Sequence, residues 1–487
     1  MKEQHIAKSV FWLTISEIIF NISGYIIHSG VGRILGPADY GRYGLVITLT
    51  TMIIILIGNG IPTAMSKFLS EVFETNPAMI NVIKNKALFL QTILISVITL
   101  IFFFSAPLIA LALGDSSLTH LFRISTLIIP SFALASFYFY YFTGIHRFNL
   151  QATLKTVRSI AKVVFILWLA WIFKLSGSII GYILAPFFVF LIAWGIDKFW
   201  ISKNFTKTKN KQLEKTSLNF STKKLFNYAW PFTLFLLFYE IMISIDLYMV
   251  KAILQNDFLT GIYNGSLTVG RIPYYLFYAL TIVLLPSISK SSAQKDNQKT
   301  KQTVSQSLRL MSILLPLGAI LMIVFAKPII YLFYGVDYFS AILPMQILVV
   351  GVSFLTVFYV LSFAFSGLGK VKLPMWIAFL GMIANIILNY FLIRKNQLIG
   401  AATATSITSF FVMLASLYFT KKEFQASLKI KSILKIGFAF IITFFLAKLF
   451  PESNYLFILW SLILSSIYFI ILYVLKEIKK EDINIKK

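Results

Sequence analysis

The stretch that decides the fold covers residues 32–71 and reads GRILGPADYGRYGLVITLTTMIIILIGNGIPTAMSKFLSE. It runs from a polar turn through a Gly-x-Tyr at Gly41 into a long apolar run, and it closes on a proline followed by Ser-Lys. A diverged copy at residues 252–290 has its Gly-x-Tyr at Gly261 and also ends on Ser-Lys. A repeat spaced by about 220 residues suggests two similar halves around a central site.

The composition places this repeat in a membrane. Of the 487 residues, 58% are hydrophobic and only 13% are charged, more apolar surface than a soluble core could bury. Apolar runs of about 20 residues recur along the chain, which predicts an all-α polytopic membrane protein. The chain has no cysteine and only four dispersed histidines, so we expect neither a disulfide nor a metal site.

The hydropathy pattern predicts about fourteen transmembrane helices. Twelve of them would form two pseudo-symmetric six-helix bundles around a central cavity, and the last two would be additional C-terminal helices. The predicted spans are 8–30, 42–66, 86–111, 120–142, 156–174, 177–197, 226–250, 260–287, 306–326, 341–366, 371–393, 398–420, 430–449 and 455–475.

The basic residues predict the orientation and the division into lobes. Lysine and arginine are roughly fourfold more abundant on the face that carries both termini, which makes that face cytoplasmic. The net charge of +26 therefore fits anionic lipid on the cytoplasmic side, and we expect no nucleic-acid partner. The predicted parts are an N-terminal lobe (1–200), a basic cytoplasmic linker (201–225), a C-terminal lobe (226–420), and two further helices with a cytoplasmic tail (421–487).

The first span carries a polar stripe. Glu17, Asn21, Gly24 and His28 follow each other at spacings that put them on one helical face. A charge in mid-bilayer costs from about 3 to over 10 kcal/mol, so each one needs a reason. One interpretation is a polar seam that packs helices together. We favour a stripe that lines the cavity, because glutamate suits a packing seam poorly.

Further charges lie in the seventh and eighth spans. Glu240 and Asp246 are six residues apart, so they point about 120° away from each other. Arg271 lies near the middle of the eighth span. It could pair with Glu240 or Glu17 to hold the lobes together, or it could grip phosphate through bidentate hydrogen bonds.

Three arginines lie at predicted outer helix ends. Arg42 and Arg123 are expected to extend to lipid headgroups, as arginines at helix ends usually do. Arg33 follows directly on the polar stripe, which favours a place at the mouth of the cavity. We find no phosphate loop, no nucleophile motif and no long outer loop with paired acids, so we expect no catalytic residues and no enzyme activity.

Short motifs in a fixed order resemble a known group of transporters. Residues 33–41 (RILGPADYG) and 60–67 (GIPTAMSK) resemble the start of polysaccharide transporters of the MOP exporter superfamily. Residues 244–249 (SIDLYM) and 261–265 (GIYNG) resemble its seventh and eighth spans, and 399–405 (IGAATAT) resembles its turn between spans eleven and twelve. The superfamily includes Wzx-type oligosaccharide-lipid flippases, MurJ-type lipid II flippases and MATE drug exporters.

The resemblance implies two bundles that face each other across a cavity, alternating access, and a lipid-linked sugar as substrate. Relatives of the MurJ type use arginines around the cavity, and Arg271 sits in a corresponding place. The first-span arginines of that type are absent, and Glu17 and Asn21 stand in the region instead. MATE-type exporters typically have twelve spans, so the fourteen expected here favour the sugar-lipid branch.

The sequence thus predicts a flippase for a polyprenyl-diphosphate-linked oligosaccharide, a cell-surface polysaccharide precursor that moves from the inner to the outer leaflet. Arg271 and Arg33 would hold diphosphate or sugar, with Asn21 and His28 in the same cavity. Glu17, Glu240 and Asp246 would bind sugar hydroxyls or a coupling cation, H⁺ or Na⁺. These residues make up the expected site. Apart from the coupling cation, no cofactor is expected.

Two alternatives remain open from the sequence: a cation-coupled, MATE-like exporter of small molecules, and a lipid II flippase. A membrane glycosyltransferase is a third class, which would need an acidic or basic outer loop. Expected partners are membrane lipids and a polysaccharide polymerase or glycosyltransferases, and the expected location is the cytoplasmic membrane.

The predicted topology can be tested in intact cells. Because the chain has no cysteine, Asn210→Cys introduces a unique thiol in the linker. A membrane-impermeant maleimide should label this thiol only after permeabilisation, whereas Ser116→Cys in a predicted outer loop should react in intact cells. Labelling of position 210 from outside would contradict the orientation.

Overall fold

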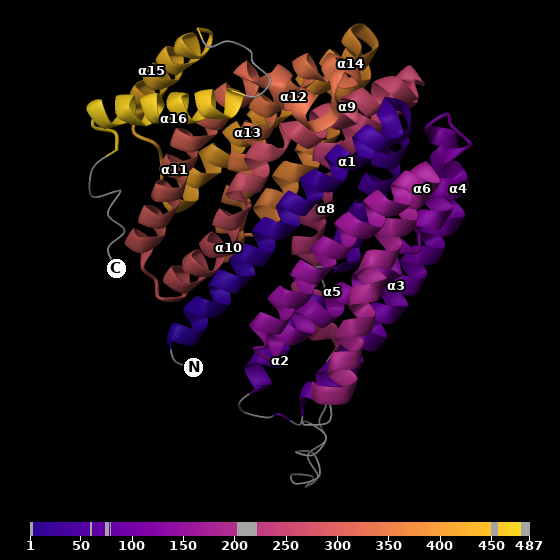
Figure 1. Cartoon of the computed structure of the whole chain (residues 1–487). Helices are drawn as coiled ribbons and strands as arrows, with labels where there is room; N and C mark the ends of the chain where they lie inside the picture. The colour runs from indigo at the N-terminus through magenta and orange to yellow at the C-terminus, as the bar shows by residue number, and fades with distance from the viewer. Residues whose placement is uncertain are drawn as a thin grey trace. The chain divides into compact units, whose positions relative to one another are not determined.

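The computed structural model describes residues 3–58, 61–73, 77, 79–201, 222–449 and 456–478, and their secondary structure is helical throughout, with no strand (Figure 1). This confirms the all-α prediction. Within these ranges, ten helices are long and apolar enough to cross a membrane. Three of the ten are 41, 54 and 53 residues long, about twice the length that one crossing needs.

The three long helices are each broken once. Helix α1 (Glu3–Gly58) breaks at Gly36, which has a φ of 74° and directly precedes Pro37. Helix α6 (Phe148–Ile196) breaks at Phe173–Lys174, and α14 (Lys372–Phe424) breaks at Asn396–Gln397. The breaks in α1 and α14 fall in the intervals that the sequence analysis left between two spans, and the break in α6 falls on the last two residues of the predicted span 156–174. Each long helix therefore contains parts of two predicted spans.

The breaks in α6 and α14 have the same geometry. Lys174 has φ 50° and ψ −132°, and Gln397 has φ 47° and ψ −125°, a region that L-residues rarely adopt. Three residues later stand Gly177 and Gly400. A Cβ added at either would lie 2.0 or 1.9 Å from a leucine carbonyl oxygen of the preceding arm. The same tight helical hairpin therefore occurs in both halves of the chain, which supports the internal repeat.

The chain divides into two compact units. Unit 1 comprises Met1–Ser244 and Gln255–Gly261, and unit 2 comprises Ile245–Leu254 and Ile262–Lys487. Most of the predicted linker 201–225 lies outside the described residues, so the division into lobes at that linker stays a prediction.

Unit 1 is built around α6. Its other helices are α2 (Ile61–Val72), α3 (Met79–Ala112), α4 (Leu118–Ser125), α5 (Ile128–Gly144), the π-helix η1 (Asp197–Ile201) and the first part of α8 (Thr222–Leu254). Helix α6 packs along α1 and α5, and α2 packs on α3 and α5. A core of buried aliphatic and aromatic residues, with Phe137, Tyr141 and Phe142 of α5 fully buried, joins α2, α3, α5 and α6.

Unit 2 is built around α13 (Ile342–Gly367). Its other helices are α9 (Asp257–Gly270, mostly in this unit), α10 (Ile272–Ala293), α11 (Asn297–Val324), α12 (Ala326–Tyr334), the 3₁₀-helix η2 (Val336–Ala341), α14, α15 (Ile430–Ala447) and α16 (Phe457–Val474). Helix α13 packs on α10 and α14. The two C-terminal helices pack on each other and on α11, as Figure 1 shows.

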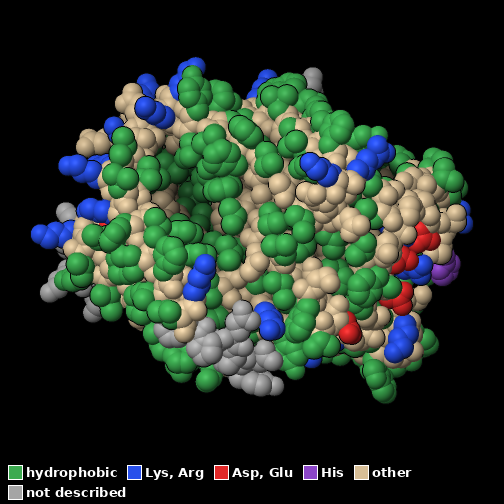
Figure 2. Space-filling view, turned by 90° about the horizontal axis from the view of Figure 1, so that it is seen from above, with side chains coloured by type: hydrophobic (Ala, Val, Ile, Leu, Met, Phe, Trp, Pro, Cys, Tyr) green, Lys and Arg blue, Asp and Glu red, His purple; other side chains and the backbone are tan. Residues whose placement is uncertain are grey.

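Large apolar side chains cover the outside of the helices. On α3, Phe104, Leu108 and Leu111 are 70%, 68% and 73% exposed, and many residues of α16 are exposed in the same way. Hydrophobic side chains also cover much of the face seen in Figure 2, with basic side chains scattered among them. Such a surface is suited to lipid, so the protein is a multi-pass membrane protein.

The hairpin glycine in α14 gives a stability test. Gly400→Ala should lower the melting temperature of the purified protein in detergent, because the new Cβ would overlap backbone and the cost of overpacking is about 1–3 kcal/mol. The control is Gly318→Ala in α11, where nothing lies within 4 Å of the added Cβ. An unchanged melting temperature for Gly400→Ala would argue against the tight hairpin.

Candidate functional site

Three basic residues form a row along the first arm of α6. Lys155, Arg158 and Lys162 are spaced by three and four residues, so they share one helical face. Arg158 and Lys162 are buried, with 4% and 6% of their surface exposed, and the Lys155 side chain is 15% exposed. We call these three residues the basic ladder. All of its neighbours described below belong to unit 1.

Arg158 lies between aromatic rings. Its guanidinium carbon is 4.4 Å from the ring centre of Phe132 and 4.6 Å from that of Phe139, both on α5. Its Nη1 reaches the Ser136 hydroxyl at 3.4 Å, and its buried Nε has no hydrogen-bond partner. Cation–π contacts stabilise a desolvated cation by about 2 kcal/mol, but they leave hydrogen-bond donors of the guanidinium available.

Lys162 and Lys155 flank Arg158 on the same face. The Lys162 ammonium donates to the Tyr182 hydroxyl at 2.9 Å and lies 4.0 Å from that ring, which belongs to the second arm of α6. The Lys155 ammonium pairs with the carboxylate of Glu17 on α1. Phe20, one turn further along α1, lies within 6.0 Å of all three cations. Helix α1 thus covers the ladder.

The ladder carries more positive than negative charge. Among the described residues, Glu17 is the one carboxylate that contacts it. The cluster of three cations and one anion therefore keeps an excess of two positive charges inside a membrane protein. Because an uncompensated buried charge costs several kcal/mol, an arrangement of this kind is suited to an anionic ligand.

The other predicted residues of the first span lie elsewhere in unit 1. His28 pairs through Nδ1 with the hydroxyl of Tyr40 at 2.9 Å and packs edge-on against Tyr40 and Tyr43, which are fully buried. It thereby ties together the two arms of α1 across the break at Gly36. Asn21 is half-buried, and Arg33 is exposed in the last turn before that break.

Asp246 is a buried junction of three helices in unit 2. Its Oδ2 accepts hydrogen bonds from the hydroxyls of Tyr263 on α9 at 2.8 Å and Thr405 on α14 at 2.9 Å, and its Oδ1 accepts from the backbone N–H of Leu247 at 2.8 Å. Tyr263 is the tyrosine of the second Gly-x-Tyr. A proton or small cation at this carboxylate would compete with these donors.

Arg271 lies at a helix break, whereas the sequence analysis placed it inside a continuous span. Helix α9 ends at Gly270 and α10 begins at Ile272, with a proline in its first turn. The guanidinium is close enough for its charge to act on the Asp246 carboxylate. Glu240, six residues before Asp246 on α8, is half-buried.

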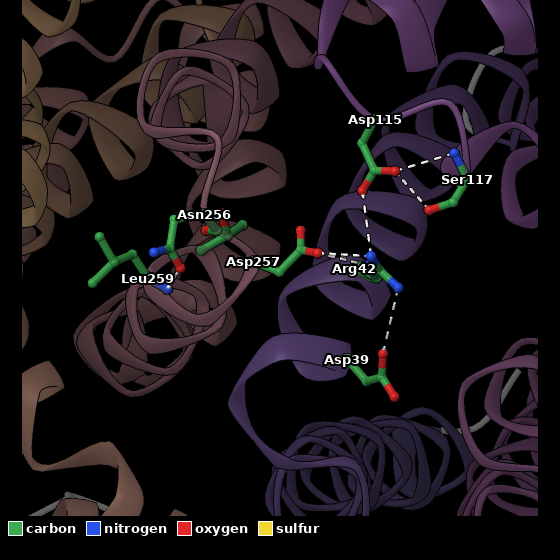
Figure 3. Close-up of polar contacts among 8 residues, drawn as sticks. Asp39, Arg42, Asp115, Ser117, Asn256, Asp257 and Leu259 are labelled. Atoms are coloured by element: carbon green, nitrogen blue, oxygen red, sulfur yellow. Dashed lines mark hydrogen bonds and ion pairs between the residues drawn. The ribbon is translucent and has the colours of Figure 1, made fainter.

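Arg42 is held by carboxylates in place of lipid headgroups (Figure 3). Its Nε donates to Asp257 at 2.9 Å, and its two terminal nitrogens lie 3.7 Å from Asp115 and 3.9 Å from Asp39. Beside this network, a Cβ added at Gly41 would lie 2.7 Å from the backbone nitrogen of Gly261. The glycines of the two Gly-x-Tyr copies therefore pack against each other within unit 1.

The sequence analysis missed the basic ladder, because it assigned all three residues to the cytoplasmic end of a span and counted them only for orientation. Their spacing of three and four residues was the available signal. The same spacing drew attention to the polar stripe of the first span, but the pairing of Glu17 with a lysine about 140 residues away depends on tertiary contacts alone.

The apolar helical fold and buried basic cluster describe a polytopic membrane transporter. A family model for polysaccharide biosynthesis proteins matches residues 6–292, and a MatE model matches residues 231–391. The chain belongs to the polysaccharide biosynthesis protein family, and its predicted membership of the MOP exporter superfamily is confirmed.

Relatives and solved structures agree with this assignment. An uncharacterized membrane protein of Methanocaldococcus jannaschii is 25% identical over 425 residues, which cover 85% of this chain and 97% of that protein. The lipid II flippase MurJ of Bacillus subtilis is 24% identical over 470 residues (87% and 84%), and the capsular polysaccharide biosynthesis protein CapF of Staphylococcus aureus is 22% identical over 428 residues (86% and 100%).

Two solved structures share the fold. A lipid II flippase MurJ in an inward closed conformation superposes with a TM-score of 0.72 at 19% identity, over 95% of this chain and 98% of that one. A multidrug resistance MATE transporter in an inward-facing conformation has a TM-score of 0.67 at 14% identity, over 86% and 98%.

Variants of Arg271 and Asp246 can test whether Arg271 binds the substrate or only neutralises the charge of Asp246. We expect Arg271→Ala to insert and fold but to lose transport, and Arg271→Lys to recover only part, because an ammonium lacks the planar fork. Adding Asp246→Asn to Arg271→Ala should not restore transport. Recovery in the double variant would show that Arg271 serves only to neutralise Asp246, and Arg394→Ala on α14 is the control.

Proposed function

We propose that this protein is a flippase that moves a polyprenyl-diphosphate-linked oligosaccharide, a precursor of a cell-surface polysaccharide, from the inner to the outer leaflet. The observation that carries the proposal is the excess of positive charge in the buried basic ladder. A hydrated anionic headgroup needs compensating charge while it crosses the bilayer, and its lipid tail can remain in the surrounding lipid.

The chemistry of the ladder suits a diphosphate. Arg158 supplies a planar guanidinium with an unpartnered buried nitrogen, and ammonium groups lie on either side of it along the helix. Phosphate groups take charge-assisted hydrogen bonds from such donors, and each bond of this kind contributes about 1.5–3 kcal/mol. In this proposal the ladder binds diphosphate. Roles for Arg271, Arg33, Asn21, His28 and Glu240 in binding the headgroup stay predictions from the sequence.

The names of relatives support the same class of substrate. One relative is named for capsular polysaccharide biosynthesis and another as a lipid II flippase, and the matching family model is described by polysaccharide biosynthesis. We extend this to the cell: the protein would work in the cytoplasmic membrane with both termini inside, next to a polymerase or glycosyltransferases that make and consume the lipid-linked sugar.

A second candidate function is a cation-coupled exporter of small molecules. The match of residues 231–391 to the MatE model favours it, as does Asp246, a buried carboxylate bonded to two hydroxyls and a backbone N–H, which could take a coupling H⁺ or Na⁺. Such an exporter could use the carboxylates of this chain but would have no need for three cations in a row.

Reconstitution in proteoliposomes distinguishes the two functions. The wild type should translocate a fluorescent polyprenyl-diphosphate oligosaccharide. Translocation is measured as the fraction of the fluorescent lipid that becomes accessible to a membrane-impermeant quencher. Arg158→Ala should slow translocation at least about tenfold, since the loss of one charge-assisted hydrogen bond is worth that factor or more.

The control for this experiment is Arg123→Ala, which removes an exposed guanidinium that stacks on Phe103 at 5.2 Å. Equal rates for Arg158→Ala and the wild type would reject the ladder as the anion site. Transport of a cationic dye without transport of the diphosphate lipid would instead favour the exporter.

A further inference from the structure

The pair between Glu17 and Lys155 is more accessible than the deeply buried ion pair described in unit 1. Its two side chains are 26% and 15% exposed, so the pair is partly accessible. The pair between Lys84 and Asp197 in unit 1 is more deeply buried, at 8% and 5% exposed, and the Lys84 ammonium also lies over the ring of Tyr141. The Glu17 pair is therefore better placed for exchange with a ligand than the buried pair.

Glu17 is also held by few contacts. Its carboxylate pairs with Lys155 through one oxygen. By comparison, Glu477 in unit 2 contacts both Arg309 and Lys435, and its backbone carbonyl also accepts from Arg309. Among the described residues Glu17 thus has one charged partner, and a carboxylate held in this way is easier to displace than one that bridges two.

The position of Glu17 matches that of a ligand anion. Its carboxylate occupies the accessible end of a row of three cations whose other members, Arg158 and Lys162, have no carboxylate in contact among the described residues. A diphosphate ester carries a negative charge on each phosphate, so it can contact several of these cations at once. A single carboxylate can neutralise only one of them.

We propose that Glu17 is an exchangeable internal counter-ion of the basic ladder. Its carboxylate holds Lys155 while the site is empty, and the diphosphate of the substrate displaces it and takes Lys155 together with Arg158. Without ligand, the ladder and Glu17 together keep an excess of two positive charges. When the Glu17 carboxylate has moved away from Lys155, all three cations are available to the ligand. This inference rests on the proposed function, because it needs the ladder to bind an anion.

The exchange links ligand binding to helix α1. Among the described residues, Glu17 and Phe20 of α1 contact the three cations, so displacement of Glu17 removes this ionic contact with α6 and leaves the aromatic one at the ladder. Ligand binding would thereby weaken one of the contacts that hold the first arm of α1 to α6, and it would do so only when an anion has taken the place of the carboxylate.

The test is a binding titration of purified full-length protein in detergent, with inorganic pyrophosphate and farnesyl diphosphate as probes. Glu17→Gln removes the competing charge and keeps the shape, so it should bind pyrophosphate about tenfold more tightly than the wild type. In a Lys155→Gln background, Glu17→Gln should have little effect, because the residue for which the two anions compete is gone. Glu477→Gln is the matched control and should bind as the wild type does.

The outcomes separate this inference from the proposed function. Unchanged or weaker binding by Glu17→Gln, with binding still lost in Arg158→Ala, would overturn the exchange and leave the anion site standing. Absence of binding in both the wild type and Glu17→Gln, or equal binding by Arg158→Ala and the wild type, would overturn both. Tighter binding of farnesyl diphosphate than of pyrophosphate would indicate a lipid headgroup as the natural source of the anion, and the reverse a free diphosphate. Melting temperatures of each variant verify folding.

Discussion

The cost of a charge in a low-dielectric interior is the constraint on which the polar architecture of this protein depends. The structure meets it in three ways. Asp246 accepts three hydrogen bonds, from donors on three helices. Lys84 and Asp197 form a buried ion pair, and the Arg158 guanidinium lies between two phenylalanine rings. Among the clusters described, the basic ladder is the one that combines largely buried cations with an excess of positive charge, which is why it carries the functional argument.

The backbone has its own constraint, which the repeat satisfies twice. In a membrane the polar groups of the main chain must be bonded internally, so helices turn back sharply or break only where the neighbouring backbone permits it. The hairpins of α6 and α14 use the same dihedral angles and the same following glycine. At Gly41 and Gly261 the two copies of the repeat touch, and Arg42 with its carboxylates lies beside that contact.

Together these features connect architecture with transport. Ion pairs that stay closed tie helices within a unit, whereas a partly accessible pair at the end of a basic row can respond to a ligand. In the proposed exchange the Glu17–Lys155 pair is of the second kind, and it joins the first helix to the helix around which unit 1 is built. A flippase for an anionic lipid needs such a coupling, because binding of the headgroup must favour a different arrangement of helices.

The sequence by itself determined the fold class and the approximate positions of the apolar helices, because apolar length, glycine and proline act locally along the chain. It did not predict the helix break at Arg271, which lies inside the predicted span 260–287. It also identified Asp246, Glu17 and Arg271 as costly residues. Only the tertiary structure decided their partners: Glu17 meets Lys155, Asp246 meets Tyr263 and Thr405, and Arg42 meets Asp257. Those contacts join residues far apart in the chain, and helical periodicity predicts which face a side chain occupies but not which helix packs against that face.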